Sequence, residues 1–128
     1  DAAGLVLFEE LSARFRLLQG QSTDVLVDMA RRTVAPLLEY DARRHTHLLD
    51  TLRTLMDNHY AVRPTAEALF IHRNTLQKRL RRIEALLDVD LTDIDDLTEL
   101  YLGLRALQLV GEAKVLAEPG GQQISAGE

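Results

Sequence analysis

Apolar residues spaced three and four positions apart recur through most of this chain, and this spacing limits its fold more than any other feature. It is the spacing of amphipathic helices, whereas no segment shows the apolar–polar alternation of a half-buried strand. Aromatic residues make up only 5% of the chain, so leucine, valine, alanine and isoleucine must fill the core. The sequence therefore predicts an all-α fold.

Glycine, proline and polar residues separate the helical segments from one another. Gly20 should end the first segment, and Ser22 is placed to cap the second, which we expect to bury Val25, Met29 and Val34. The helices are expected over about residues 5–18, 22–36, 43–58, 64–70, 73–87 and 93–112.

Two prolines and one polar pair mark further helix boundaries. Pro36 should break or kink the second helix because it has no N–H to donate, and the third helix should then start near residue 43 or 44. Pro64 suits the first position of the short fourth helix, where a missing N–H costs nothing. Thr92 with Asp95 resembles a capping box at the start of the last helix.

Charge is distributed unevenly along the chain. The net charge is −5, yet residues 63–82 carry six Lys and Arg side chains against a single acid. Residues 83–104 carry seven acids and neither Lys nor Arg. The first segment can face the phosphates of a nucleic acid and the second cannot, so the distribution matters more than the sum.

Residues 64–87 have the pattern of two helices with a tight connection. The small Ala66 faces inward and lets the second helix cross close by, while Leu69 and Ile71 fill the corner. The second helix has a stripe roughly 60° wide formed by Leu76, Leu80, Ile83 and Leu87. Its opposite side is polar and cationic. This predicts a helix-turn-helix whose recognition helix, about 73–87, enters the major groove of double-stranded DNA.

The free side of that helix carries the donors that DNA recognition needs. Arginine can bond two acceptors on guanine, and Asn or Gln can pair with adenine. Residues near the start of a recognition helix reach deepest, so we expect base contacts from Arg73, Asn74, Gln77 and Lys78. Phosphate contacts, which fix the register without reading sequence, are expected from His72, Thr75, Arg79, Arg81 and Arg82. For His72 the alternative is that it caps the helix.

Basic amphipathic helices also occur in proteins that bind no nucleic acid. The same face is compatible with a solvated surface, or with a protein-interaction module that docks an acidic partner. The acids from Asp88 to Glu99 resemble a calcium loop, but Asp93 stands where that loop requires glycine, so we interpret them as charges at a helix start. With no nucleophile elbow, phosphate loop or zinc spacing, we predict no enzyme, cofactor or metal site.

Three stretches of this chain form a specific set of motifs: LLDTLR at 48–53, TAEALFIHRNTL at 65–76 and RLRRIE at 79–84. Together they resemble the C-terminal helix-turn-helix of the PucR/CdaR family of bacterial transcription regulators, which control purine and sugar-diacid catabolism. The hairpin also resembles the DNA-binding end of the Fis nucleoid protein. The chain departs from the family at Gln77 and Lys78, where members often carry Arg and Tyr, and at Arg63, where many have a small capping residue. Phe70 stands where other helix-turn-helix families favour glycine.

The resemblance implies a domain organisation. Residues 1–42 are expected to be a helical extension from the end of an upstream regulatory region, and residues 43–113 the DNA-binding domain. Residues 114–128 lack periodicity and are expected to be a disordered tail. The effector is expected to bind an upstream region absent from this chain.

The remaining expectations concern location and assembly. The chain has no apolar run near 18 residues, no signal peptide and no cysteine, which agrees with a cytoplasmic protein and predicts no membrane contact. The apolar side of the helix at 5–18 must pack either within the molecule or on a second copy of the chain. A homodimer therefore stays open at this point.

Overall fold

The computed structural model describes residue 16 and residues 18–117, and the regular structure of this part is entirely helical. The all-α prediction is thus confirmed. The helices are α2 (Thr23–Arg44), α3 (Leu48–Asp57), α4 (Val62–Leu69), α5 (Arg73–Leu87), α6 (Ile94–Val110) and α7 (Glu112–Leu116). The expected helix at 5–18 lies almost wholly outside the described residues.

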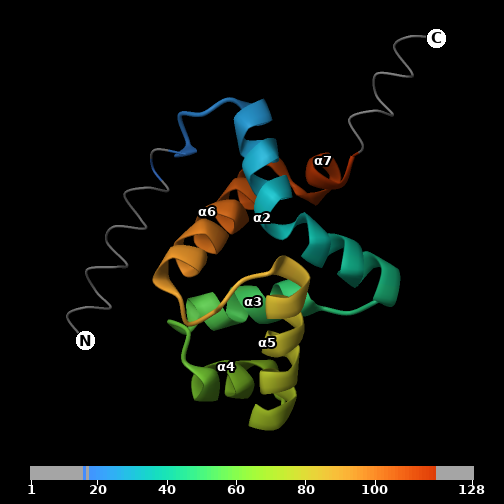
Figure 1. Cartoon of the computed structure of the whole chain (residues 1–128), viewed down its shortest axis with the longest axis vertical. Coiled ribbons are helices and arrows are strands. Elements are labelled where there is room, and N and C mark those ends of the chain that lie inside the picture. Colours follow the sequence, from blue (N-terminus) through green and yellow to red (C-terminus); the bar gives the residue numbers. More distant parts are fainter. Residues whose placement is uncertain (1–15, 17, 118–128) are drawn as a thin grey trace.

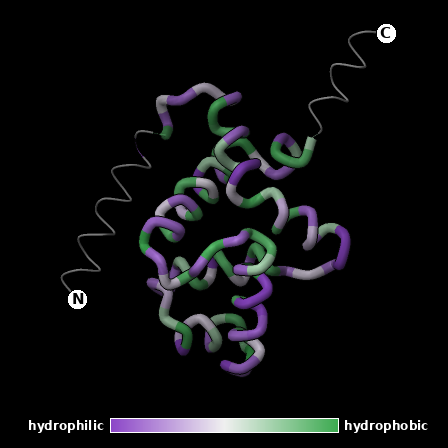
Figure 2. The backbone as a smooth tube through the Cα atoms, in the orientation of Figure 1, coloured by the Kyte–Doolittle hydropathy of each residue, from purple (hydrophilic) through white to green (hydrophobic). Residues whose placement is uncertain are grey.

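Helix α2 joins two groups of helices. Figure 1 shows α2 crossing α6 with α7 nearby, while α3, α4 and α5 lie together in the lower part of the molecule. Helix α2 also packs on α3 and α5, so one core extends across both groups. Hydrophobic and hydrophilic residues alternate in patches along each helix (Figure 2), as amphipathic helices in a common core require.

The prediction that Pro36 interrupts α2 was half right. The helix runs on from Thr23 to Arg44 with Pro36 inside it, and Figure 1 shows that it bends along its course. Pro36 is exposed, so the backbone bond that it cannot make is lost on the solvent side, which a bend accommodates. Of the residues expected to be buried, Val34 is buried, Met29 is half-buried and Val25 is exposed.

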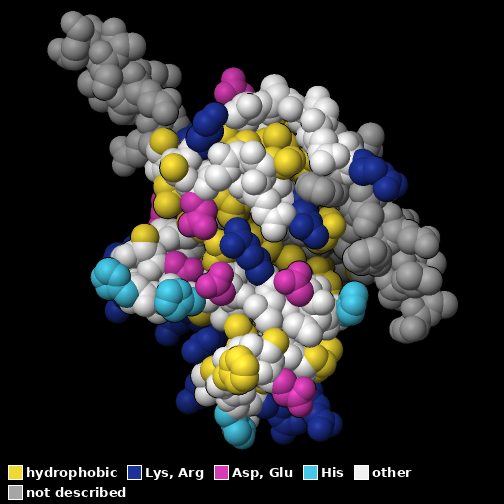
Figure 3. All heavy atoms as spheres, turned by 180° about the vertical axis from the view of Figure 1, so that it is seen from behind, with side chains coloured by type: hydrophobic (Ala, Val, Ile, Leu, Met, Phe, Trp, Pro, Cys, Tyr) yellow, Lys and Arg dark blue, Asp and Glu magenta, His cyan; other side chains and the backbone are white. Residues whose placement is uncertain are grey.

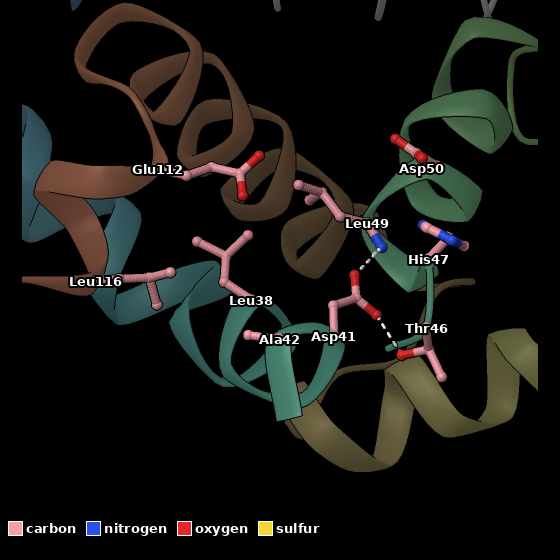
Figure 4. A pocket seen from close by; sticks show the side chains of 9 residues that line it. All are labelled: Leu38, Asp41, Ala42, Thr46, His47, Leu49, Asp50, Glu112 and Leu116. Carbon is pink, nitrogen blue, oxygen red and sulfur yellow. Dashed lines mark hydrogen bonds between the residues drawn. The ribbon is translucent and has the colours of Figure 1, made fainter. Parts of the chain in front are cut away.

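Helix α3 begins at Leu48, not at residue 43 or 44 as the sequence suggested. Helix α2 ends when His45 takes a left-handed conformation with φ 56°. The Asp41 carboxylate then accepts hydrogen bonds from the backbone N–H groups of Leu48 (2.8 Å) and Leu49 (2.9 Å) and from the Thr46 hydroxyl (2.6 Å). Figure 4 shows the bonds from Leu49 and Thr46. A carboxylate at the end of one helix thus caps the next.

The start of α6 also differs from its prediction. Its cap is Asp93, whose carboxylate accepts from the Asp96 N–H, and not Thr92 with Asp95. The Thr92 hydroxyl instead donates to the Asp90 carboxylate at 2.6 Å. Beyond Gly111, the short α7 occupies the beginning of the segment expected to be a tail, and residues 118–128 lie outside the described part.

The guanidinium of Arg31 holds α7 against α2. Its Nε donates to the carbonyl of Val115 at 2.9 Å, and its Nη2 donates to the carbonyls of Lys114 and Ala117. These carbonyls belong to the end of a helix and have no partner within it. One side chain of α2 therefore supplies hydrogen-bond donors to the carbonyl groups at the C-terminal end of α7.

Candidate nucleic-acid interface

The predicted helix-turn-helix is formed by α4 and α5. Thr65 and Ala66 are buried, and the small alanine lets α5 approach closely. Phe70 ends α4 in a left-handed conformation with φ 57°, and the Ile71 N–H donates to the Ala66 carbonyl at 3.1 Å. The chain thus turns from α4 into α5 within three residues.

The start of α4 lies two residues earlier than predicted. The helix begins at Val62, so Pro64 is its third residue and not its first. The first four N–H groups of a helix have no partner within it, so proline costs no hydrogen bond here either. The helix-start residue is the small Ala61, and Arg63 instead makes an exposed ion pair with Glu67 at 3.5 Å. Exposed pairs of this kind contribute little stability.

Helix α5 has the bounds that the sequence predicted, Arg73 to Leu87. Its stripe is anchored as expected, since Leu76 and Ile83 are wholly buried, Leu80 is 8% exposed and Leu87 is half-buried against the core. Burying such side chains stabilises each by about 1.5–3 kcal/mol. The helix is therefore fixed from one side only.

The opposite face of α5 is open to solvent. The structure places six of the predicted contact residues there as exposed side chains and leaves two half-buried at its edges. The exposed ones are Arg73, Asn74, Thr75, Lys78, Arg81 and Arg82, and the half-buried ones are Gln77 and Arg79. Figure 3, from behind, shows Lys and Arg side chains gathered around the end of the molecule formed by α4 and α5.

His72 shapes the start of this face. Its Nδ1 accepts a hydrogen bond from the Asn74 backbone N–H at 2.9 Å and so caps α5. A ring nitrogen that accepts carries no proton, so the neutral ring has its proton on Nε2, where it remains a donor. The positive end of the helix dipole lies at the same place. The start of α5 is thus arranged to receive an acceptor or an anion.

Acids at the end of α5 and the start of α6 accept hydrogen bonds from the loop that joins these helices. Glu84 accepts from the Leu91 N–H, and Asp96 accepts from the Asp90 N–H, both at 2.8 Å. Hydrogen bonds from the Thr92 side chain and backbone lower the pKa of Asp90 below its ordinary value. These contacts keep the carboxylates in the connection between α5 and α6. Among the described residues, no group of acids and histidines is arranged to hold a metal ion.

Sequence reasoning missed a contact between α2 and the α5 face. The Arg82 guanidinium lies 5.8 Å from the centroid of the Tyr40 ring, and those of Arg43 and Arg44 each lie 5.9 Å from it. Arg43 and Arg44 lie almost forty residues before Arg82 in the chain. No local pattern could have found this cluster, because it depends on how α2 packs on α5.

A hollow of about 260 Å³ lies between α2, the start of α3 and α7 (Figure 4). Its lining residues include Asp41, His47, Asp50 and Glu112. The Asp41 carboxylate in it is already used as the cap of α3.

Within residues 18–117, none of the helices has the length and apolar character needed to span a bilayer.

Known proteins share this sequence pattern. The family described as the PucR C-terminal helix-turn-helix domain matches residues 48–106. The proline-responsive transcriptional activator PutR of Bacillus subtilis is 32% identical over 95 residues, which are 73% of this chain and 23% of that protein. The carbohydrate diacid regulator of Escherichia coli is 54% identical over 41 residues, 32% of this chain and 11% of that protein.

The purine catabolism regulatory protein of Bacillus subtilis is 38% identical over 63 residues, 49% of this chain and 12% of that protein. The matched parts thus span less than a quarter of the length of these three relatives. No solved structure matches the chain.

Proposed function

Residues 48–106 of this chain belong to the PucR C-terminal helix-turn-helix family, and from this premise we propose that the chain binds operator DNA sequence-specifically through α5. The resemblance seen in the sequence is confirmed, and the family consists of transcription-regulator domains, not of an enzyme class. In the proposed complex, α5 lies in the major groove.

One observation supports this proposal above the others. Helix α5 buries one narrow stripe, Leu76, Leu80 and Ile83, and leaves most of its cationic side exposed to solvent. A helix of 15 residues is about 22 Å long, enough to follow the groove with its first turns and to reach the rim with its last.

The residues divide between reading bases and holding phosphates. Arg73, Asn74, Gln77 and Lys78 lie on the first two turns, from which we propose that they contact base edges. The proposed phosphate contacts come from His72, Thr75, Arg79, Arg81 and Arg82. In this scheme the Nε2–H of His72 donates to a phosphate oxygen, while its Nδ1 keeps the cap.

The first experiment enriches random duplex DNA on the chain and measures affinity for the selected sequence. We expect Arg73→Ala and Asn74→Ala each to weaken specific binding by about 1–3 kcal/mol and to relax the preference at one base pair. Arg32→Ala is the matched control, because Arg32 is exposed on α2 and paired with Asp28. Circular dichroism checks that the fold is kept.

Two results would count against the proposal. One is recovery of no preferred sequence. The other is wild-type affinity of both variants on the selected duplex. If the chain instead bound acidic polypeptides tightly and showed no preference among DNA sequences, a protein-interaction module would be the better description of the α5 face.

The relatives are much longer than this chain, so we propose that an effector acts on an upstream region and that the regulator works in the cytoplasm, where its DNA is. Two chains on one operator would place their α5 helices on half-sites about 34 Å apart. The selected sequence tests this directly, because a dimer should select DNA that contains two half-sites. The mass of the chain in solution should then be that of a dimer.

A further inference from the structure

The last turn of α2 brings two arginines beside an arginine of α5. The guanidinium carbons of Arg43, Arg44 and Arg82 all lie within 6 Å of the Tyr40 ring centroid. The three arginines are exposed and Tyr40 is half-buried. We call these four residues the Tyr40 cluster.

The Tyr40 cluster concentrates positive charge without a paired acid. The ion pairs among the described residues are Arg32 with Asp28 and Arg63 with Glu67, and neither includes a member of the cluster. The ring face attracts cations, which helps to hold guanidinium groups close together. Their mutual repulsion nevertheless leaves the site favourable for an anion.

The dipole of α2 explains only part of this arrangement. Basic residues in the last turn of a helix are stabilised by its negative end, and Arg43 and Arg44 stand there. Arg82 comes from another helix and converges on the same ring. The cluster is therefore a joint feature of α2 and α5, and it continues the cationic side of α5.

Its position relative to α5 indicates which anion it meets. Arg82 follows Arg73 by nine residues, about 13–14 Å along the helix, and the major groove is about 12 Å wide. With the start of α5 in the groove, Arg82 reaches the phosphates at the rim. Arg43 and Arg44 then lie beyond the rim, outside the matched region 48–106.

We propose that the Tyr40 cluster binds consecutive backbone phosphates of the DNA that flanks the base pairs read by α5. This inference rests on the proposed function. It extends the DNA-binding surface into α2, and it makes the end of that helix part of the interface. The contact reads no sequence and adds affinity on any duplex long enough to reach it.

The test measures affinity against salt concentration for the whole chain. Each phosphate contact contributes about 0.9 to the slope of log affinity against log salt, so Arg43→Ala with Arg44→Ala should lower the slope by about 2. Arg32→Ala on the same helix is the control and should leave the slope unchanged. The preference for the selected sequence over a scrambled one should be the same in all three proteins.

Trimming the DNA sharpens the test. On a duplex cut back to the base pairs read by α5, the wild-type slope should fall by at least the amount that the double substitution removes, because Arg82 also loses its phosphate. The double variant should then no longer differ from the wild-type chain. A difference that persists on the trimmed duplex, or a double variant with the wild-type slope on long DNA, would overturn the proposal.

The two proposals fail in different ways. Slopes are measured on the scrambled duplex as well, so the Tyr40 cluster is tested even if no sequence is preferred. Loss of polyglutamate binding in the double variant, with an unchanged DNA slope, would assign the cluster to an acidic protein partner and reject the phosphate assignment. Unchanged thermal unfolding of the variants shows that the exposed arginines do not hold the fold.

Discussion

Helices α5 and α6 follow each other in the chain and have similar lengths, 15 and 17 residues, yet they are used in opposite ways. Helix α5 buries three residues on one stripe and carries five Lys and Arg side chains. Helix α6 buries six residues, Leu97, Leu100, Gly103, Leu104, Ala106 and Leu107, and its one cationic residue is Arg105.

The difference shows how a small helical domain separates stability from binding. Helix α6 packs mainly on α2 and also contacts α7, with buried residues on more than one side. Helix α5 is held along a single line, so its polar face can change without disturbing the core. Because α5 has three buried residues where α6 has six, each buried residue of α5 must contribute a larger share of the contacts that hold its helix.

The largest effect is expected at the anchor of α5. Leu76 is fully buried, and Leu76→Ala should lower the free energy of unfolding by about 2–5 kcal/mol, since it removes apolar contact and leaves a cavity. Urea unfolding measures the change. The control is Arg81→Ala on the exposed face, which should change stability by less than about 0.5 kcal/mol. Equal effects of the two substitutions would contradict the one-sided anchoring.

A second effect is expected where α6 meets α2. A Cβ added at Gly103 would lie 1.8 Å from Thr33 Oγ1 and 2.6 Å from Thr33 Cβ, so the helices must separate. Alanine usually stabilises a helix interior relative to glycine, but Gly103→Ala should destabilise this domain by about 1–3 kcal/mol. The control is Glu99→Ala on the exposed side of α6. A higher melting temperature for Gly103→Ala would show that the packing is looser than described.

A smaller effect of opposite sign is expected at the turn before α5. Phe70 is 95% exposed and left-handed, a conformation that glycine adopts without strain. Phe70→Gly should raise the free energy of unfolding by about 1 kcal/mol. Asp88 stands in the same left-handed conformation at the end of α5. Asp88→Gly should raise the free energy of unfolding by less, because aspartate tolerates this conformation better than phenylalanine. A loss of stability in Phe70→Gly would mean that the ring makes contacts in the folded state.

The smallest effect at neutral pH concerns Tyr60, between α3 and α4. Burial raises its pKa to about 12, with a contribution from Tyr101. The folded pKa is above the unfolded value of about 10, so this contribution to stability is complete below pH 10 and is lost as pH rises toward 12. Urea unfolding of Tyr60→Phe and the wild-type chain should show a difference in stability that changes only above pH 10. A constant difference up to pH 12 would reject the burial argument.

Local spacing in the sequence determined the helical class, the bounds of α5 and its buried stripe. These features depend on contacts between residues three and four positions apart, and such contacts form within a single helix. The His72 cap is equally local, since its ring nitrogen bonds the backbone two residues ahead. The base-contact and phosphate-contact assignments stay predictions until DNA binding is measured.

Only the tertiary structure decided the features that join distant segments. Helix α2 continues past Pro36 because α6, α5 and α3 pack along its length, and α3 starts where the Asp41 carboxylate reaches its N–H groups. The Tyr40 cluster likewise exists because α2 and α5 meet at one ring. Periodicity specifies which side of a helix is apolar, but not which other helix that side will cover or which charges its ends will then bring together.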